Sequence, residues 1–326
     1  MKKLYAVVFI LFLSGSTSYG QDPHFSQFYA NPLYLNPAFA GTSLCPRVIL
    51  NFRDQWPSIA GTYVTYNASY DQHIDKISGG IGVLLNTDRA GQGILNTTNV
   101  SFMYSYRLEV NRKFSMKLAI QATYFQKRLD WSKLTFGDMI DKRHGFVFNT
   151  NEIQPGRLNK SNADFSAGIL GYGEKYFIGF AVHHLTQPDE GFISKSRMPR
   201  RFTVHAGGVI NLIKKVRRHS NDHIPTLSPN ILFMQQANFQ EINYGLYFNR
   251  YPFVGGLWFR QNFKNADAII FMVGIQASMF KIGYSYDLTI SKLTNATGGA
   301  HEVSFAIQFG CKDPRKHVKA IQCPSF

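Results

Sequence analysis

Cysteine and histidine are the residues best suited to redox or metal chemistry, and their placement in this chain indicates neither. The 326 residues include three cysteines, Cys45, Cys311 and Cys323, and no two of them have the close spacing of zinc ligands. In an oxidising compartment two of the three would form a disulfide, and the third would stay free or pair with another chain. His183 and His184 stand at a predicted strand end, where loop contacts are expected rather than a metal site.

Serine, histidine and aspartate are all present, but no catalytic motif joins them. The sequence has no Gly-x-Ser-x-Gly elbow, no His-Glu-x-x-His motif and no phosphate-binding loop. We therefore predict no enzymatic activity and no cofactor. A lipid or peptide hydrolase whose site is assembled across strands is kept as an alternative, and a Ser/His pair directed to the surface would mark it.

The N-terminus predicts export. Residues 1–20 have the pattern of a secretory signal peptide, with two lysines ahead of an apolar run over residues 4–13. This run is too short to span a bilayer as a helix. Small residues at Ser18 and Gly20 predict cleavage before Gln21. The alternative is an uncleaved membrane anchor, but no long apolar stretch follows.

Composition favours a membrane barrel over a soluble domain. Aromatic residues make up 15% of the chain and charged residues only 17%, whereas a soluble domain usually carries about 25% charge. No apolar run after the signal peptide reaches the length of a transmembrane helix. An outer-membrane barrel, with an apolar band edged by aromatic girdles, has this combination of features.

The formal net charge of +15 could indicate nucleic-acid binding, but the export signal argues against it, and we predict no nucleic-acid partner. Basic residues gather at 197–201, 214–218 and 312–319. These clusters are either solvated loops that meet anionic headgroups of membrane lipid or docking sites for an acidic periplasmic partner. Composition does not separate the two.

From residue 47 onward, segments of about ten residues alternate between apolar and polar or small side chains. Phe280, Ile282 and Tyr284, for example, alternate with Lys281 and Gly283. A period of two places the two kinds on opposite faces of a strand. In a barrel the apolar face meets lipid, whereas in a soluble sandwich it would form the core.

We therefore predict an all-β protein, an antiparallel transmembrane outer-membrane β-barrel of about fourteen strands. The barrel takes residues 47–310, after an irregular segment over 21–46 and before a periplasmic tail over 311–326. The expected strands are 47–55, 61–71, 78–87, 94–108, 113–127, 163–173, 175–185, 201–213, 226–238, 240–250, 252–262, 267–278, 279–289 and 299–310.

An even strand number places both ends of the barrel in the periplasm, with short turns there and longer loops outside. The longest outer loops are expected at 128–162 and 186–200. The exception is 214–225, a long periplasmic turn that carries four basic residues, and we interpret it either as a partner site or as an unstructured solvated turn. These four residues are Lys214, Lys215, Arg217 and Arg218.

The segment 21–46 is rich in proline and aromatic residues. Pro23, Pro32 and Pro37 disfavour a regular strand, and Asn-Pro pairs start turns. Its aromatic rings must be buried somewhere, so we expect an ordered, irregular segment that plugs or caps the periplasmic mouth of the barrel. The alternative is a flexible leader.

Motifs in this segment and beyond it resemble the PorP/SprF family of type IX secretion proteins. They comprise Asp22-Pro-x-Phe-Ser-Gln-Phe, two Asn-Pro pairs with a following Ala-Phe-Ala-Gly, and an Arg-x-Gln-Trp stretch at 53–56. Shorter matches lie at 66–71, 283–287, 298–304 and the C-terminus. Asp54 stands where the family pattern suggests Asn. The residues that carry the main likeness are Asp22, Pro23, Phe25, Ser26, Gln27, Phe28, Asn31, Asn36, Pro37, Ala38, Gly41, Arg53, Gln55 and Trp56.

The resemblance implies a non-enzymatic outer-membrane component of type IX secretion, the route linked to gliding motility and surface adhesins. SprF-like members are expected to help export a secreted cargo protein with a C-terminal sorting domain, or to anchor it at the surface. PorP-like members are expected to work with periplasmic components, a lipoprotein and a peptidoglycan-binding protein. The sequence does not assign the chain to either group, and a diffusion porin or small-molecule transporter is the alternative function.

Aromatic residues in loop 128–162 suit a contact with a secreted partner, because aromatic rings bury much area at low entropic cost. The alternative is that this loop folds inward as a constriction. The candidate contacts are Trp131, Phe136, Phe146, Val147 and Phe148.

The expected topology also brings two cysteines together. In a closed antiparallel barrel the first and last strands pair, so Cys45 and Cys311 both lie at the periplasmic rim, where a disulfide would link the seam. A bond from Cys323 to either one is the alternative.

Overall fold

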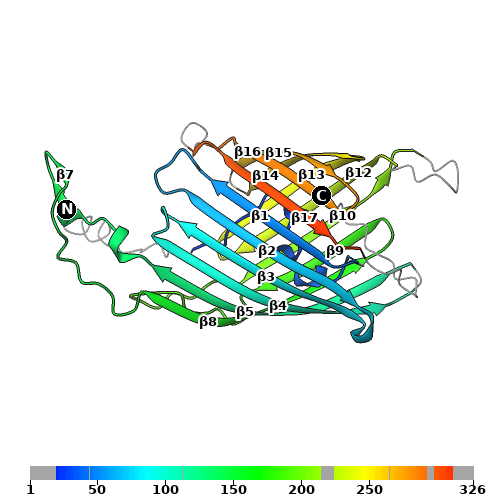
Figure 1. The fold of residues 1–326 in the computed structure, drawn as a ribbon, viewed down its shortest axis with the longest axis horizontal. Coiled ribbons are helices and arrows are strands. Elements are labelled where there is room, and N and C mark those ends of the chain that lie inside the picture. Colours follow the sequence, from blue (N-terminus) through cyan, green and yellow to red (C-terminus); the bar gives the residue numbers. More distant parts are fainter. Residues whose placement is uncertain are drawn as a thin grey trace, which may run out of the picture.

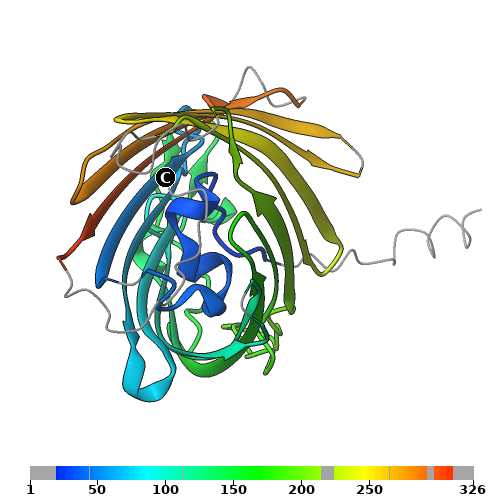
Figure 2. The same ribbon diagram turned by 90° about the vertical axis from the view of Figure 1, so that its right-hand side faces the viewer.

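The computed structural model describes residues 20–43, 45–111, 113–213, 224–263, 265–291 and 297–310. Across these residues one antiparallel sheet closes into a barrel, seen from the side in Figure 1 and along its axis in Figure 2. The first strand pairs with the last over its whole length, from Arg47 opposite Gln308 to Gln55 opposite Ala300. The sheet consists of β1 (Arg47–Gln55), β2 (Tyr63–Ile74), β3 (Gly79–Ala90), β4 (Leu95–Glu109), β5 (Ser115–Leu129), β8 (Asn159–Tyr172), β9 (Tyr176–His183), β10 (Arg201–Gly208), β11 (Ile210–Asn211), β12 (Thr226–Gln236), β13 (Phe239–Arg250), β14 (Phe253–Asn262), β15 (Ala266–Gln276), β16 (Phe280–Thr289) and β17 (Ala300–Gln308).

These fifteen segments form the fourteen strands of the barrel wall, because β10 and the two-residue β11 are consecutive pieces of one strand and both pair with β12. The predicted fold, a closed antiparallel barrel of fourteen strands, is confirmed. One predicted strand, 201–213, is interrupted. β9 begins at Tyr176, which pairs with Gly208, so β10 has no strand on that side beyond this point.

Side chains alternate across the wall as the sequence pattern requires. In β5, Lys117 and Gln121 are buried inside the barrel, whereas Leu118 and Ile120 between them are exposed on the outer surface, Ile120 by 67%. Large apolar residues cover the outside in this way on every side of the barrel. Within the described residues, no helix is long and apolar enough to cross a membrane.

The two ends of the barrel differ. Residues 130–158 and 184–200 form the longest described connections and lie at one end, which we call the long-loop end. The opposite end, the short-turn end, has brief connections such as 173–175 and 251–252. The loop from β5 to β8 carries the small hairpin of β6 (Ile140–Asp141) and β7 (Gly145–Phe146). This loop projects well beyond the strands (Figure 1), which argues against the alternative that it folds inward as a constriction.

Cys45, just before β1, is disulfide-bonded. The backbone N–H of Phe309 donates to the carbonyl of Pro46 at 3.0 Å, which continues the pairing of β1 and β17 toward this cysteine. Cys311 and Cys323 lie outside the described residues, so the Cys45–Cys311 pairing stays a prediction, which non-reducing peptide mapping decides. Also outside them are residues 1–19, the tail 311–326, and the basic residues Lys214, Lys215, Arg217 and Arg218.

Candidate functional site

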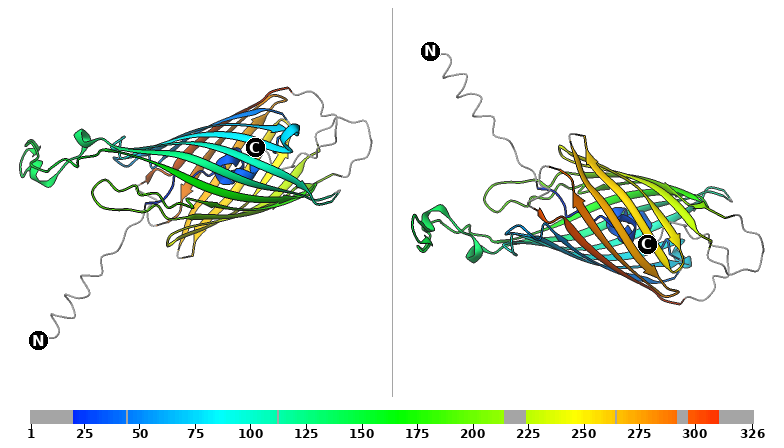
Figure 3. Two further views of the ribbon diagram at one scale, coloured as in Figure 1. Left: turned by 90° about the horizontal axis from the view of Figure 1, so that it is seen from below. Right: turned by 90° about the horizontal axis from the view of Figure 1, so that it is seen from above.

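Residues 21–41, which we call the inner segment, run through the interior of the barrel from one end to the other (Figures 2 and 3). Asp22 contacts Arg201 at the long-loop end, and Gly41 contacts Asp71 near the short-turn end. Between them lie three short helices: η1 (Phe28–Ala30), α2 (Pro32–Leu35) and η2 (Pro37–Phe39). The expected segment was periplasmic or in the lumen, as a plug or cap of the periplasmic mouth; the contacts of residues 21–41 extend along the lumen.

The position of the inner segment follows from its rings, which need apolar walls. Phe28 lies 5.2 Å from Trp258 of β14, measured between ring centroids, and Tyr29 lies 5.5 Å from Phe177 of β9. Phe39 stacks on His205 of β10 at 5.2 Å. All these side chains are buried. The interior of the barrel thus contains a packed hydrophobic cluster whose central part is supplied by the inner segment.

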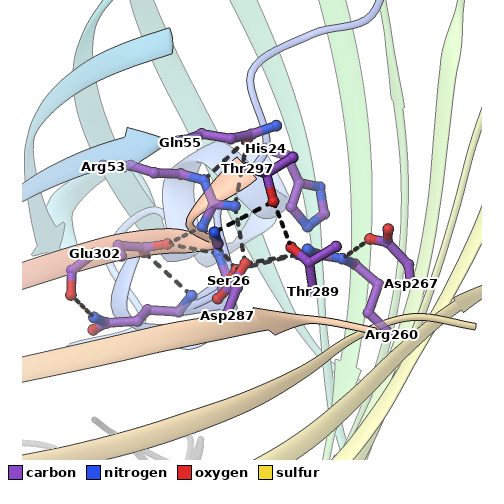
Figure 4. A network of polar contacts seen from close by, with 12 residues as sticks. His24, Ser26, Arg53, Gln55, Arg260, Asp267, Asp287, Thr289, Thr297 and Glu302 are labelled. Carbon is purple, nitrogen blue, oxygen red and sulfur yellow. Dashed lines mark hydrogen bonds and ion pairs between the residues drawn. The ribbon is translucent and has the colours of Figure 1, made fainter. Parts of the chain in front are cut away.

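A buried network of charges fixes the segment nearer the long-loop end (Figure 4). Arg53 of β1 pairs with Asp287 of β16 at 2.9 Å and with Glu302 of β17 at 3.1 Å. Arg260 of β14 also reaches Asp287, at 3.0 Å. Arg260 pairs as well with Asp267 of β15, at 2.6 Å, so each buried arginine faces two carboxylates, which removes most of the cost of burying its charge alone.

The inner segment enters this network through Ser26 and Gln27. The Ser26 hydroxyl donates to Asp287 at 2.5 Å and accepts from Arg53 at 2.8 Å. The backbone N–H groups of Ser26 and Gln27 both donate to the Glu302 carboxylate, at 2.7 and 3.2 Å. Hydrogen bonds to a charged acceptor are stronger than neutral ones, so the carboxylate holds this turn of the segment tightly.

This network brings together separate pieces of the sequence that carried the family resemblance. Ser26 and Gln27 come from the N-terminal motif, Arg53 from the Arg-x-Gln-Trp stretch, and Asp287 and Glu302 from the C-terminal matches. They lie on three adjacent wall strands, β16, β17 and β1, and on the segment inside. The shared motifs thus specify how the inner segment attaches to the barrel.

Asn36, between α2 and η2, anchors the middle of the segment. Its side-chain N–H group donates to the carbonyl of Ile169 at 3.1 Å, and its Oδ1 accepts from the backbone of Ala38 at 2.9 Å. The approach to the wall is so close that a Cβ on Gly168 would lie 2.1 Å from Asn36 Oδ1. Glycine is therefore required at this position of β8.

Near the short-turn end the segment leaves the lumen through a similar close contact. Gly41 has φ +60°, and a Cβ on Gly80 of β3 would lie 2.4 Å from the carbonyl oxygen of Ala40. The same carbonyl accepts from Lys117 Nζ at 2.5 Å and from the Ser105 hydroxyl at 2.7 Å. The backbone therefore presses directly on the wall and is hydrogen-bonded there.

At the long-loop end a second set of charges, which we call the Asp22 latch, holds the start of the segment. His184 bridges Asp22 and Asp164 at 2.8 and 2.7 Å, and Arg201 pairs with Asp22 at 2.9 Å. The guanidinium of Arg201 also lies 4.7 Å from the ring centroid of Tyr34. Burial would lower the pKa of His184, but the two carboxylates outweigh it and raise that pKa to about 9.

Above the inner segment, a cavity of about 240 Å³ lies toward the long-loop end. Its apolar lining comes from Phe25 and Phe28 of the segment and from Met234 and Phe239 of the wall. Arg53, Gln55, Trp56 and Arg201 add polar groups. A cavity with a few convergent polar groups can hold a side chain or a small ligand.

Nothing in this arrangement is a catalytic constellation among the residues that the structure describes. The same residues include no group of three or more His, Cys, Asp or Glu side chains able to hold a metal ion. The hydroxyl of Ser26 is buried and bonded to charged groups on both sides. These hydrogen bonds and ion pairs attach the inner segment to the barrel wall. Ser26 and His184 act there as structural contacts.

The candidate partner residues lie far from this network. Trp131 and Phe136 pack on each other at 5.0 Å at the base of the projecting loop, and Phe146 and Phe148 near its tip are exposed by 58% and 54%. Gln55 and Trp56 stand at the rim, where Trp56 adopts φ 61° and its N–H donates to Gly299. The structure brings together the motif residues and separates them from the loop residues.

Sequence reasoning missed Arg260, Arg201 and the role of His184. Each carries a signal that strand parity could have revealed, because a charge at an inward position of a membrane barrel needs a partner inside. Arg260 falls in phase with the buried Trp258, and Arg201 with the buried Thr203 and His205.

Residues 17–307 of the chain match the family described as type IX secretion system membrane protein PorP/SprF. The chain belongs to the PorP/SprF family. A match over this length includes the inner segment and every wall strand except the last residue of β17. An outer-membrane location fits both the barrel and the family. No curated protein matches the chain.

Solved structures that resemble the chain are porins and channels. A KdgM porin is 8% identical, with a TM-score of 0.37, and covers 81% of this chain and 99% of its own. A deletion mutant of the TodX monoaromatic hydrocarbon channel is 9% identical, with a TM-score of 0.45, and covers 85% and 94%. An engineered porin of Rhodopseudomonas blastica is 7% identical, with a TM-score of 0.33, and covers 82% and 99%.

The first prediction for this PorP/SprF protein concerns the buried network. Arg53→Gln should lower the free energy of unfolding by about 3–5 kcal/mol, because it leaves the Glu302 carboxylate buried without a cation. The double variant Arg53→Gln/Glu302→Gln should regain part of the loss, since it removes that charge. Arg250→Gln, at an exposed rim position, is the matched control. Urea unfolding in detergent measures all three, and a double variant no more stable than Arg53→Gln would contradict the assignment.

The second prediction is a pH dependence at the Asp22 latch. The pKa of His184 is raised from 6.5 to about 9 in the folded protein. Its charge therefore stabilises the fold fully below about pH 6.5, and the contribution is lost as pH rises through about 9. The stability difference between wild type and His184→Gln should be largest at pH 6, at most about 3 kcal/mol, and should vanish near pH 10.5. A difference that is the same at both pH values would show that His184 acts without its charge.

Proposed function

We propose that this barrel is a non-enzymatic component of type IX secretion that assists the export or surface anchoring of cargo proteins with a C-terminal sorting domain. One observation carries the proposal: the lumen is filled by a segment whose family motifs fasten it to the wall. A barrel built in this way suits a rigid platform for binding more than a channel for diffusion. The proposed location is the outer membrane.

The outer contact is proposed to be the projecting loop of residues 130–158. It reaches beyond the strand ends, and its exposed Phe146 and Phe148 give it apolar area that water does not favour. Exposed aromatic residues of this kind mark interaction surfaces. The cavity above the inner segment opens at the same end, so a secreted partner could contact both.

The inner contact is proposed to be with periplasmic components, a lipoprotein and a peptidoglycan-binding protein. The support comes from the family and from the basic sequence at 214–218. An acidic partner would complement these charges.

The third prediction tests the outer contact. Phe146→Ser/Phe148→Ser should reduce the amount of cargo held at the cell surface several-fold, because the pair supplies exposed apolar contact area. Ile193→Ser, in the loop between β9 and β10, is the matched control, since Ile193 is 87% exposed and lies on the other loop at the same end. Cell-surface proteomics measures how much cargo is retained. Equal cargo retention in the loop variant and the control would contradict this role for the loop.

The alternative function is a diffusion porin or small-molecule transporter, as the solved structures of similar fold suggest by their names. The fourth prediction is that the wild-type protein gives no steady conductance in planar bilayers. A variant that combines Arg53→Gln, Ser26→Ala and Arg201→Gln should conduct intermittently, because its inner segment is released. A wild-type conductance equal to that of open porins would favour the alternative.

A further inference from the structure

A groove of about 680 Å³ lies on the outside of the barrel wall at the long-loop end, over strands β2 to β5. The groove is separate from the lumen, because its lining residues on the strands point outward and alternate with the inward-facing ones. Three of the lining residues are cations, namely Arg89, Arg128 and Lys133, and one is an acid, Asp130. The groove therefore has an excess of positive charge.

Strand register sets the two arginines in one row. Arg89 of β3 pairs with Asn96 of β4, and Asn96 pairs with Arg128 of β5. Neighbouring strands lie about 4.8 Å apart, so the two arginines start from backbones about 10 Å apart on the same face. Their long side chains can converge on one anionic group that sits over Asn96.

The rows below change stepwise from polar to apolar. The next row of outward-facing side chains, toward the middle of the barrel, is Thr87, Thr98 and Gln126. The row after it is Leu85, Val100 and Tyr124. Successive rows are about 7 Å apart along the strands. Phe102, one row further down, is 61% exposed on the outer surface. The face thus passes from hydrocarbon-facing rows to a hydroxyl row and then to the cationic row.

The arginines are available to a ligand. Within the described part of the chain, neither Arg89 nor Arg128 has a carboxylate within salt-bridge distance. Arg89 lies 5.8 Å from the ring centroid of Tyr66, which holds the guanidinium over the groove. Lys133 is only loosely paired, at 3.7 Å from Asp130. Arginine is favoured for phosphate because its planar fork donates two parallel hydrogen bonds.

We propose that this groove binds the phosphorylated sugar headgroup of a lipopolysaccharide molecule in the outer leaflet. The acyl chains lie against the apolar rows, the sugar hydroxyls meet Thr87, Thr98 and Gln126, and the phosphate meets Arg89, Arg128 and Lys133. A free anion would use the cationic row alone and leave the polar and apolar rows below it without a role. The long-loop end of an outer-membrane barrel faces the outer leaflet.

This lipid site is independent of the proposed cargo contact, since it uses the wall and not the projecting hairpin. A bound, relatively immobile glycolipid would fix the height and rotation of the barrel in the outer leaflet. It would also add a negatively charged surface beside the base of the projecting loop.

The fifth prediction tests the groove with the full-length protein in detergent, titrated with fluorescent diphosphoryl lipid A. Arg89→Gln/Arg128→Gln/Lys133→Gln should weaken binding about tenfold or more, because it removes three charged contacts to phosphate. The control Lys76→Gln/Lys175→Gln/Arg250→Gln removes the same charge from the short-turn end and should bind as wild type. Heat-modifiable migration on gels confirms that both variants are folded.

Competition separates the possible sources of the anion. Dephosphorylated lipid A, phosphatidylglycerol and inorganic phosphate should each displace the probe only at much higher concentration than lipid A itself. The proposal is overturned if the groove variant binds lipid A as tightly as wild type, or if phosphatidylglycerol or phosphate competes equally well. It is also overturned if an acidic peptide is bound through the three cations while lipid A is not, since the groove would then belong to a protein partner.

Discussion

The interior of this fourteen-stranded barrel is filled, and the arginines buried in it are paired with carboxylates; the rest of the structure depends on this constraint. The wall alone does not fill the space, so residues 21–41 complete the core with their rings and helical turns. The ion pairs of Arg53 with Asp287 and Glu302, and of Arg260 with Asp287, then decide where the segment sits, because its backbone N–H groups donate to Glu302 and its Ser26 hydroxyl donates to Asp287. The same residues therefore both fill the lumen and attach the inner segment to the wall.

This arrangement separates two tasks in space. On the inside, the buried polar groups at Ser26 and Asn36 attach the segment to the wall. The outside of the long-loop end presents two groups that can meet other molecules, the aromatic hairpin loop and the cationic row beside lipid, and the small cavity above the segment lies in the lumen at the same end. This division is the basis for the proposal that the barrel acts as a support whose surfaces bind.

Much of the fold was accessible from the alternation of side chains. The predicted strand 47–55 agrees with β1 at both ends, and each of the fourteen strands of the wall corresponds to a predicted strand. Errors appear where the period of two gives no signal: β8 begins at Asn159, four residues before the predicted 163, because its first residues are polar on both faces. For residues 21–41 the prediction went no further than a periplasmic or lumen position, since a list of aromatic residues does not say which wall will accept each ring.

The sequence by itself determined the barrel, its strand number, the polarity of its two faces and its family, because these depend on local periodicity and on short motifs. Only the tertiary structure decided that Ser26, Arg53, Asp287 and Glu302 are one site, as they lie up to 276 residues apart and meet only when β1 closes on β17. The same holds for Arg89 and Arg128, which register places in one row. Contacts that depend on closure and register carry no local signature, so composition and spacing could not reveal them.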